Sequence, residues 1–136
     1  MIGVLITTHG DLGNELLLAT ELIEGKPKQS VLCISVDKTK SAEDLKKKIN
    51  VSIKKLDQGQ GVLILTDLFG GTPSNISLSF LKEGKVEVVT GVNLPMLLKL
   101  SDARKKEMNL NEFACYIKEY GKKNIYLASD LLTTSP

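Results

Sequence analysis

The chain of 136 residues contains one histidine, two cysteines and no tryptophan. A single imidazole cannot form a multi-histidine metal site or a relay between two histidines, so we expect no metal. Two cysteines cannot supply the disulfide framework of a small secreted domain. An excess of one charge is also missing, because 18 basic and 16 acidic residues leave a net charge of +2, which gives little reason to bind nucleic acid. Any histidine chemistry must therefore be performed by His9.

The sequence also lacks a recognisable targeting or membrane-spanning segment. The apolar run at residues 2–7 has no basic stretch before it and is too short for a signal peptide or a membrane span. Cys33 and Cys115 lie within apolar runs of strand and helix character, which predicts small buried side chains rather than reactive thiols. These features favour a reducing, cytoplasmic location.

Short apolar runs alternate with segments of helical period along the chain. This alternation predicts an α/β sandwich with a four-stranded parallel core sheet, and right-handed crossovers favour the doubly wound strand order 2-1-3-4. Thr72 is expected to cap the third helix with Pro73 at its first position, and Gly121 is expected to end the last helix. The predicted strands are residues 2–7, 31–36, 61–66, 86–90 and a final piece at 125–128, and the predicted helices are 11–24, 41–56, 72–81, 94–103 and 110–120.

Two polar residues follow strands that the predicted order makes neighbours. His9 follows the first strand and Asp67 follows the third, at the switch point where doubly wound sheets bind ligands. A carboxylate that accepts a hydrogen bond from Nδ1–H would leave Nε2 as a nucleophile and would stabilise the cation formed on attack. A locally bonded loop histidine and a turn-forming aspartate explain the same two residues without any ligand.

A glycine-containing loop leads from Asp67 into the third helix. Gly70 and Gly71 would let backbone N–H groups turn toward an anion, and the helix start adds the positive end of its dipole. Together with Gly10 and the hydroxyls of Thr72 and Ser74, this loop is a candidate phosphoryl-binding site. A plain turn before a capped helix accounts for the same residues. Nucleotide-binding motifs of the GxxxxGK[ST] and GxGxxG types are absent.

Two stretches carry a family resemblance. Residues 2–13 read Ile-Gly-Val-Leu-Ile-Thr-Thr-His-Gly-Asp-Leu-Gly, and residues 61–75 read Gly-Val-Leu-Ile-Leu-Thr-Asp-Leu-Phe-Gly-Gly-Thr-Pro-Ser-Asn. Together they resemble the IIA component of the mannose family of the bacterial phosphoenolpyruvate:sugar phosphotransferase system, and the resemblance covers nearly the whole chain. Two departures from the usual pattern are Thr72, where serine is commoner, and Gly13, where alanine is frequent.

The resemblance implies a role for each site residue. His9 would accept a phosphoryl group from the phosphocarrier protein HPr and pass it to a IIB component, which works with the membrane components IIC and IID. Asp67 would orient the histidine, and no metal, nucleotide or other cofactor is needed. The family's fifth, antiparallel strand is exchanged across a homodimer, here at about residues 125–128. Residues 1–136 would form one stand-alone IIA domain, cytoplasmic or peripheral to a membrane permease complex.

Some apolar residues at the same end of the sheet are expected to stay exposed as a docking surface for both partners, although most of them could be core, which taken singly is favoured for Leu68 or Leu94. Two other functions remain open on the same residues. One is the phosphotransfer subunit of a dihydroxyacetone kinase system, and the other is a regulatory module whose phosphorylation is read by another protein. The candidate docking residues are Leu12, Leu68, Phe69, Leu94, Pro95 and Met96.

Overall fold

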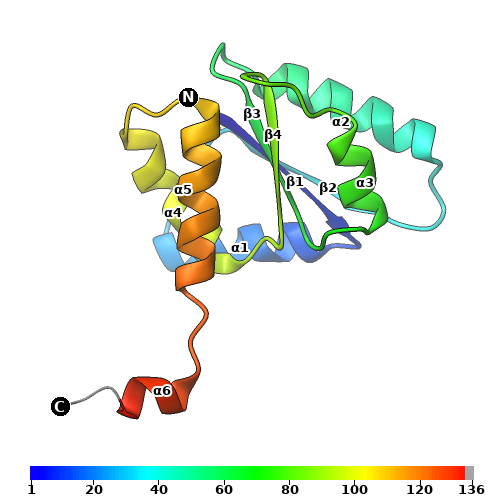
Figure 1. The fold of residues 1–136 in the computed structure, drawn as a ribbon. Helices are drawn as coiled ribbons and strands as arrows, with labels where there is room; N and C mark the ends of the chain where they lie inside the picture. The colour runs from blue at the N-terminus through cyan, green and yellow to red at the C-terminus, as the bar shows by residue number, and fades with distance from the viewer. Residues whose placement is uncertain (134–136) are drawn as a thin grey trace.

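A computed structural model of the protein describes residues 1–133, which form a sheet with helices on both faces (Figure 1). The four strands are all parallel and run in the order β2-β1-β3-β4, which confirms the predicted α/β sandwich. The strands are β1 (Gly3–His9), β2 (Val31–Val36), β3 (Val62–Thr66) and β4 (Val86–Thr90). Helices α1 (Leu12–Glu24), α4 (Leu94–Lys105) and α5 (Leu110–Lys123) cover one face, and α2 (Ala42–Leu56) and α3 (Thr72–Leu78) cover the other.

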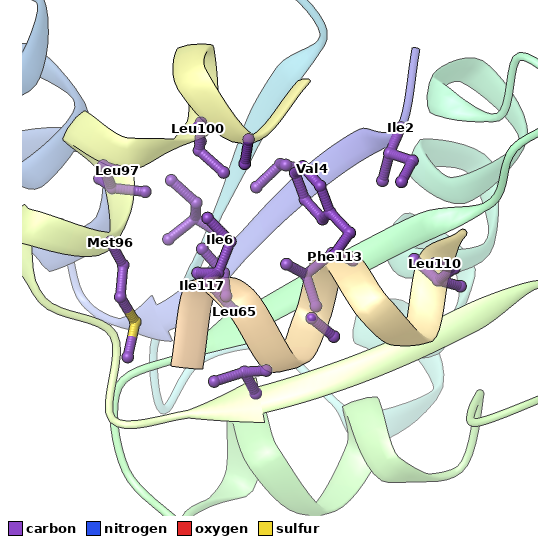
Figure 2. Packing of buried hydrophobic residues seen from close by; sticks show 14 residues of the cluster. Ile2, Val4, Ile6, Leu65, Met96, Leu97, Leu100, Leu110, Phe113 and Ile117 are labelled. Carbon is purple, nitrogen blue, oxygen red and sulfur yellow. The ribbon is translucent and has the colours of Figure 1, made fainter. Parts of the chain in front are cut away.

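The two central strands are apolar without interruption because both of their faces are buried. On β1, Val4 and Ile6 point toward α4 and α5, whereas Leu5 points toward α2 and α3. Figure 2 shows the first of these layers, in which side chains of β1 and β3 meet those of α4 and α5. The core of the domain therefore lies on both sides of β1 and β3, and it fixes the ends of these two strands rigidly side by side.

A close contact between α4 and α5 explains a residue that the sequence analysis misjudged. Gly121 does not end the last helix but lies within it, buried, two residues before its end at Lys123. A Cβ at Gly121 would collide with the Cε atom of Met96 and would lie 2.8 Å from its Cγ atom. Glycine is present here because the two helices approach each other closely, and the helix continues through it.

The helix starts follow the expected capping chemistry with one correction. Ser41 caps α2 by accepting a hydrogen bond from the backbone N–H of Asp44 at 3.1 Å. In α3 the cap is Gly71 and not Thr72, which is already helical. This helix also ends earlier than predicted, at Leu78, and the chain continues to Leu81 through turns of the i→i+3 type.

The predicted fifth strand is not formed in the single chain. Residues 125–127 have no regular secondary structure, and Ala128 begins a short helix, α6 (Ala128–Thr133). Figure 1 shows this segment leaving the end of α5 and running away from the sheet. A strand needs a neighbour to pair its backbone groups, and the segment points away from both sheet edges. Exchange of this segment between two copies stays a prediction.

The two cysteines differ in their surroundings. Burial raises the pKa of the half-buried Cys33 thiol to about 11, with the carboxylate of Glu21 adding to the effect. Cys115 is exposed on α5, so the prediction of a buried side chain was wrong there. None of the helices in residues 1–133 combines the length and the apolar character of a membrane span.

Candidate active site

His9 and Asp67 meet where β1 and β3 end. His9 is the last residue of β1, Asp67 directly follows β3, and the parallel register pairs Thr7 with Thr66 immediately before them. Oδ2 of Asp67 accepts a hydrogen bond from the backbone N–H of His9 at 3.0 Å and lies 2.8 Å from its Nδ1 atom. The imidazole is 49% exposed and the carboxylate 8% exposed. The proximity predicted from the strand order is confirmed.

Hydrogen bonds keep the carboxylate of Asp67 ionised. Burial alone would raise its pKa, but hydrogen bonds from the backbone N–H and the imidazole of His9 outweigh this effect and hold the pKa below its ordinary value. Its other oxygen, Oδ1, accepts from the backbone N–H of Leu68 at 3.0 Å. Because an ionised carboxylate can only accept, Nδ1 of His9 must carry a proton, and in the neutral ring the lone pair of Nε2 is then available.

The glycine loop packs against the imidazole. A Cβ at Gly71 would lie 2.8 Å from Cε1 and 3.4 Å from Nε2 of His9, although its backbone, at φ −80°, would suit any residue. Gly70 is different, since it adopts φ +88° and a Cβ there would face open space among the described residues. Asn75 holds the loop through hydrogen bonds to the carbonyls of Gly70 and Gly71. The loop therefore lies directly beside the Nε2 edge of the ring.

A second set of contacts fixes the loop that follows β1. The side chains that form it belong to Thr8, Asp11 and Ser35, for which the sequence analysis predicts no role. Thr8 Oγ1 accepts from the backbone N–H of Gly13 at 2.8 Å, and Ser35 Oγ donates to Oδ1 of Asp11 at 3.1 Å. A Cβ at Gly13 would lie 2.9 Å from Cγ2 of Ile6, which explains why this chain has glycine at a position where the family frequently has alanine. The position of Thr8, a polar residue at the end of an otherwise apolar strand, could have indicated this role.

The predicted phosphoryl-binding residues divide into two groups. Gly10 and Thr72 are exposed and line the space next to His9, and the two loop glycines lie against the imidazole. Ser74 is fully buried, and its hydroxyl has no hydrogen-bond partner among residues 1–133. The burial of Ser74 argues against the predicted hydrogen bond from its hydroxyl to a phosphoryl group on the exposed imidazole.

The predicted docking residues also divide. Leu12, Leu68 and Phe69 are exposed, and Phe69 is the most exposed of them at 73%. Leu94 and Pro95 are half-buried at the start of α4. Met96 is only 4% exposed and packs in the core against α5, so its assignment to a docking surface was wrong. Among residues 1–133, no three His, Cys, Asp or Glu side chains gather as a metal site would require.

Comparison with known proteins places this site in a family. The family model described as "PTS system fructose IIA component" matches residues 3–118. The chain is 33% identical over 125 residues to the mannose-specific EIIAB component of the phosphotransferase system (PTS) of Escherichia coli K12, covering 91% of this chain but only 38% of that protein. It is 29% identical over 133 residues to the fructose-specific EIIA component of Bacillus subtilis 168, covering 97% and 90% of the two chains.

The solved structures agree with the sequence comparison. The crystal structure of EIIA from Streptococcus agalactiae superposes with a TM-score of 0.85 at 26% identity, over 96% of this chain and 99% of that one. The chain therefore belongs to the mannose/fructose family of IIA components of the sugar phosphotransferase system, although it spans only 38% of the length of the mannose-specific EIIAB relative.

Proposed function

We propose that His9 is the phosphorylated residue of this chain, that phospho-HPr is the donor, and that a IIB component is the acceptor, serving sugar uptake and phosphorylation. We also propose that residues 1–136 act as one IIA domain. The observation that carries the proposal is the 2.8 Å contact between Nδ1 of His9 and Oδ2 of Asp67. It leaves the other ring nitrogen, Nε2, as the nucleophile beside Gly71.

The transfer needs little more than orientation and charge stabilisation. The lone pair of Nε2 forms a bond to phosphorus while the bond between phosphorus and the donor's leaving atom breaks, and the reverse process loads the acceptor. The carboxylate of Asp67 stabilises the positive charge that develops on the imidazole during attack. We assign the stabilisation of the phosphoryl oxygens to the backbone N–H groups of Gly70 and Gly71 and to the hydroxyl of Thr72, because Gly71 lies against the imidazole and Thr72 lines the space beside it.

Labelling with phosphate tests the proposal directly. The protein is incubated with phosphoenolpyruvate, the general phosphotransferase enzyme and HPr, and the adduct is examined for acid lability and base stability. We expect one phosphoryl group on His9 that a IIB component removes, and no label in His9→Ala. Label that persists in His9→Ala would refute the assignment. The Asp67→Asn variant serves as the matched control, since it retains the nucleophile and loses only the anionic partner, and we expect slower transfer.

We propose further that the chain forms a homodimer by exchanging the segment after α5. Ile125, Tyr126 and Leu127 support this, because three successive large apolar side chains are exposed in the single chain. Pairing with the sheet of a second copy would cover them and satisfy their backbone groups. Light scattering after gel filtration should give a dimer for the natural chain and a monomer for Ile125→Asp/Leu127→Asp. A natural chain that elutes as a monomer would exclude the exchange.

A further inference from the structure

A cavity of about 540 Å³ opens beside His9, on the side of the sheet that α2 and α3 cover. Its walls are the carboxyl ends of β1 and β2, the loop of residues 37–41, and the first turns of α2 and α3. Val36, Leu45 and Ile76 give it an apolar floor. Small-molecule sites in proteins typically measure roughly 300–1,000 Å³ and have such mixed walls. The cavity therefore has the size and lining of a ligand site, and no step of the phosphoryl transfer uses its floor.

Lysine side chains surround this cavity although none lies in the two loops that hold His9 and Asp67. Lys38, Lys40 and Lys48 all line it. Lys40 lowers the pKa of the Lys48 ammonium group, while the carboxylates of Asp37 and Asp44 act in the opposite direction. Within residues 1–133, no carboxylate lies within 4.0 Å of any of these three ammonium groups. The cavity is thus lined by cationic side chains that have no ion-pair partner among the described residues.

The single carboxylate in the lining is already engaged. Oδ1 of Asp37 accepts hydrogen bonds from the backbone N–H of Thr39 at 2.8 Å and from its hydroxyl, so this group stabilises the loop. The N-terminus of the 15-residue helix α2, at Ser41 and Ala42, also faces the cavity and adds the positive end of its dipole. Three lysines against one aspartate leave the lining with an excess of positive charge.

We propose that this cavity binds a small organic phosphate, with the doubly charged phosphate between Lys40 and Lys48 and an apolar group against Val36, Leu45 and Ile76. The charge of the pair of ammonium groups matches that of a phosphate monoester, and the apolar floor favours a ligand that carries more than the phosphate alone. The assignment of the ligand depends only on the cavity and its charges, and it does not require that His9 be phosphorylated.

A regulatory consequence follows from the position of the cavity and rests on the proposed function. His9, Gly10 and Thr72 line the same cavity, so a bound phosphate and a phosphoryl group on His9 would repel each other at short range. Because coupling between two sites is reciprocal, bound ligand makes phosphorylation of His9 less favourable by the same free energy by which phosphorylation of His9 weakens binding of the ligand. The cavity would thereby allow a metabolite to reduce phosphoryl flow through this component.

Binding is tested on the unphosphorylated protein with phenylphosphonate, whose P–C bond prevents transfer to His9. Amide shifts in ¹H–¹⁵N spectra, followed in mildly alkaline buffer, should map to residues 36–48 and to Ile76. Affinity should fall for inorganic phosphate, which lacks the apolar group, and for phenylacetate, which carries a single charge. Lys40→Gln/Lys48→Gln should weaken the binding of phenylphosphonate by about tenfold or more. Lys46→Gln/Lys54→Gln, which removes the same charge from exposed positions of α2, should leave it unchanged.

Three results would overturn the proposal. The first is the absence of saturable shifts, and the second is equal weakening by both double variants, which would indicate non-specific attraction. The third is a Lys40→Gln/Lys48→Gln variant that binds phenylphosphonate normally but is no longer phosphorylated by HPr in the absence of ligand, which would assign the lysines to a protein partner. Failure of the phosphocarrier proposal is separate, because it would appear as unlabelled His9 in a protein that still binds phenylphosphonate.

Discussion

Replacing Gly71 by alanine should displace the imidazole of His9 without disturbing the backbone. The new Cβ would lie 2.8 Å from Cε1 of His9, whereas carbon atoms in contact normally lie about 3.5–4.0 Å apart. The ring must therefore move by roughly 0.7–1.2 Å, and a misplacement of about 1 Å can slow a reaction by about 100-fold. We expect single-turnover transfer from phospho-HPr to slow by about 10- to 100-fold, with φ near −80° still suiting alanine.

Two further variants separate the steric effect from changes in the loop and the helix start. Gly71→Ser is a better N-cap for α3 than alanine is. Because it carries the same Cβ as Gly71→Ala, it should slow transfer to the same extent. Gly70→Ala places its Cβ in open space and strains the backbone at φ +88°, at a cost of about 1–2 kcal/mol in stability. It should leave the imidazole in place and slow transfer much less. If Gly71→Ala gives the spectrum of a folded protein and still transfers at the natural rate, the reasoning is refuted.

Three other changes test the pH dependence, the exposed surface and the packing. Because the pKa of Asp67 is lowered in the folded state, its hydrogen bonds stabilise the protein above the unfolded pKa of about 3.9 and are lost as the pH falls through the folded value. Urea unfolding should therefore find Asp67→Asn less stable than the natural chain by about 1–3 kcal/mol at neutral pH, with the difference shrinking in acid; a difference independent of pH would contradict this. Phe69→Ala should slow transfer from HPr while changing the free energy of unfolding by less than about 0.5 kcal/mol, and unchanged kinetics would remove Phe69 from the docking surface. Gly121→Ala should destabilise the fold by about 1–3 kcal/mol through its collision with Met96, and part of this loss should disappear in the Met96→Ala background; full additivity of the two changes would show that the contact is not strained.

The strand order and the central pair of residues could be predicted because they follow from strong local signals. Two apolar runs, each ending in a polar residue, make β1 and β3 recognisable, and parallel neighbours in a 2-1-3-4 sheet must end at the same edge. The contact between His9 and Asp67 then requires no further information. The two residues are 58 positions apart in the chain, yet the topology alone places them together.

The orientation of side chains on the helices could not be predicted in the same way. In α4, most of the first turns are apolar, so no polar stripe distinguishes the buried side with Met96 from the half-buried side with Leu94. In α3, only seven residues long, serines alternate with apolar residues, and the buried position of Ser74 depends on how the helix packs on the sheet. The gathering of Lys40 and Lys48 depends on the path of the loop between β2 and α2, which carries no periodic pattern.

The two hydrogen bonds that Asp67 receives from His9 fix the orientation of the imidazole independently of the exposed loops around it. One bond comes from the backbone at the end of β1 and the other from the ring, so the carboxylate ties the imidazole to the sheet and not to a loop. Under the proposed function, the same nitrogen must face a donor and then an acceptor of different shape. Because the ring is held by the strand end, both partners would meet it in one orientation, while the exposed Phe69 lies on the neighbouring loop.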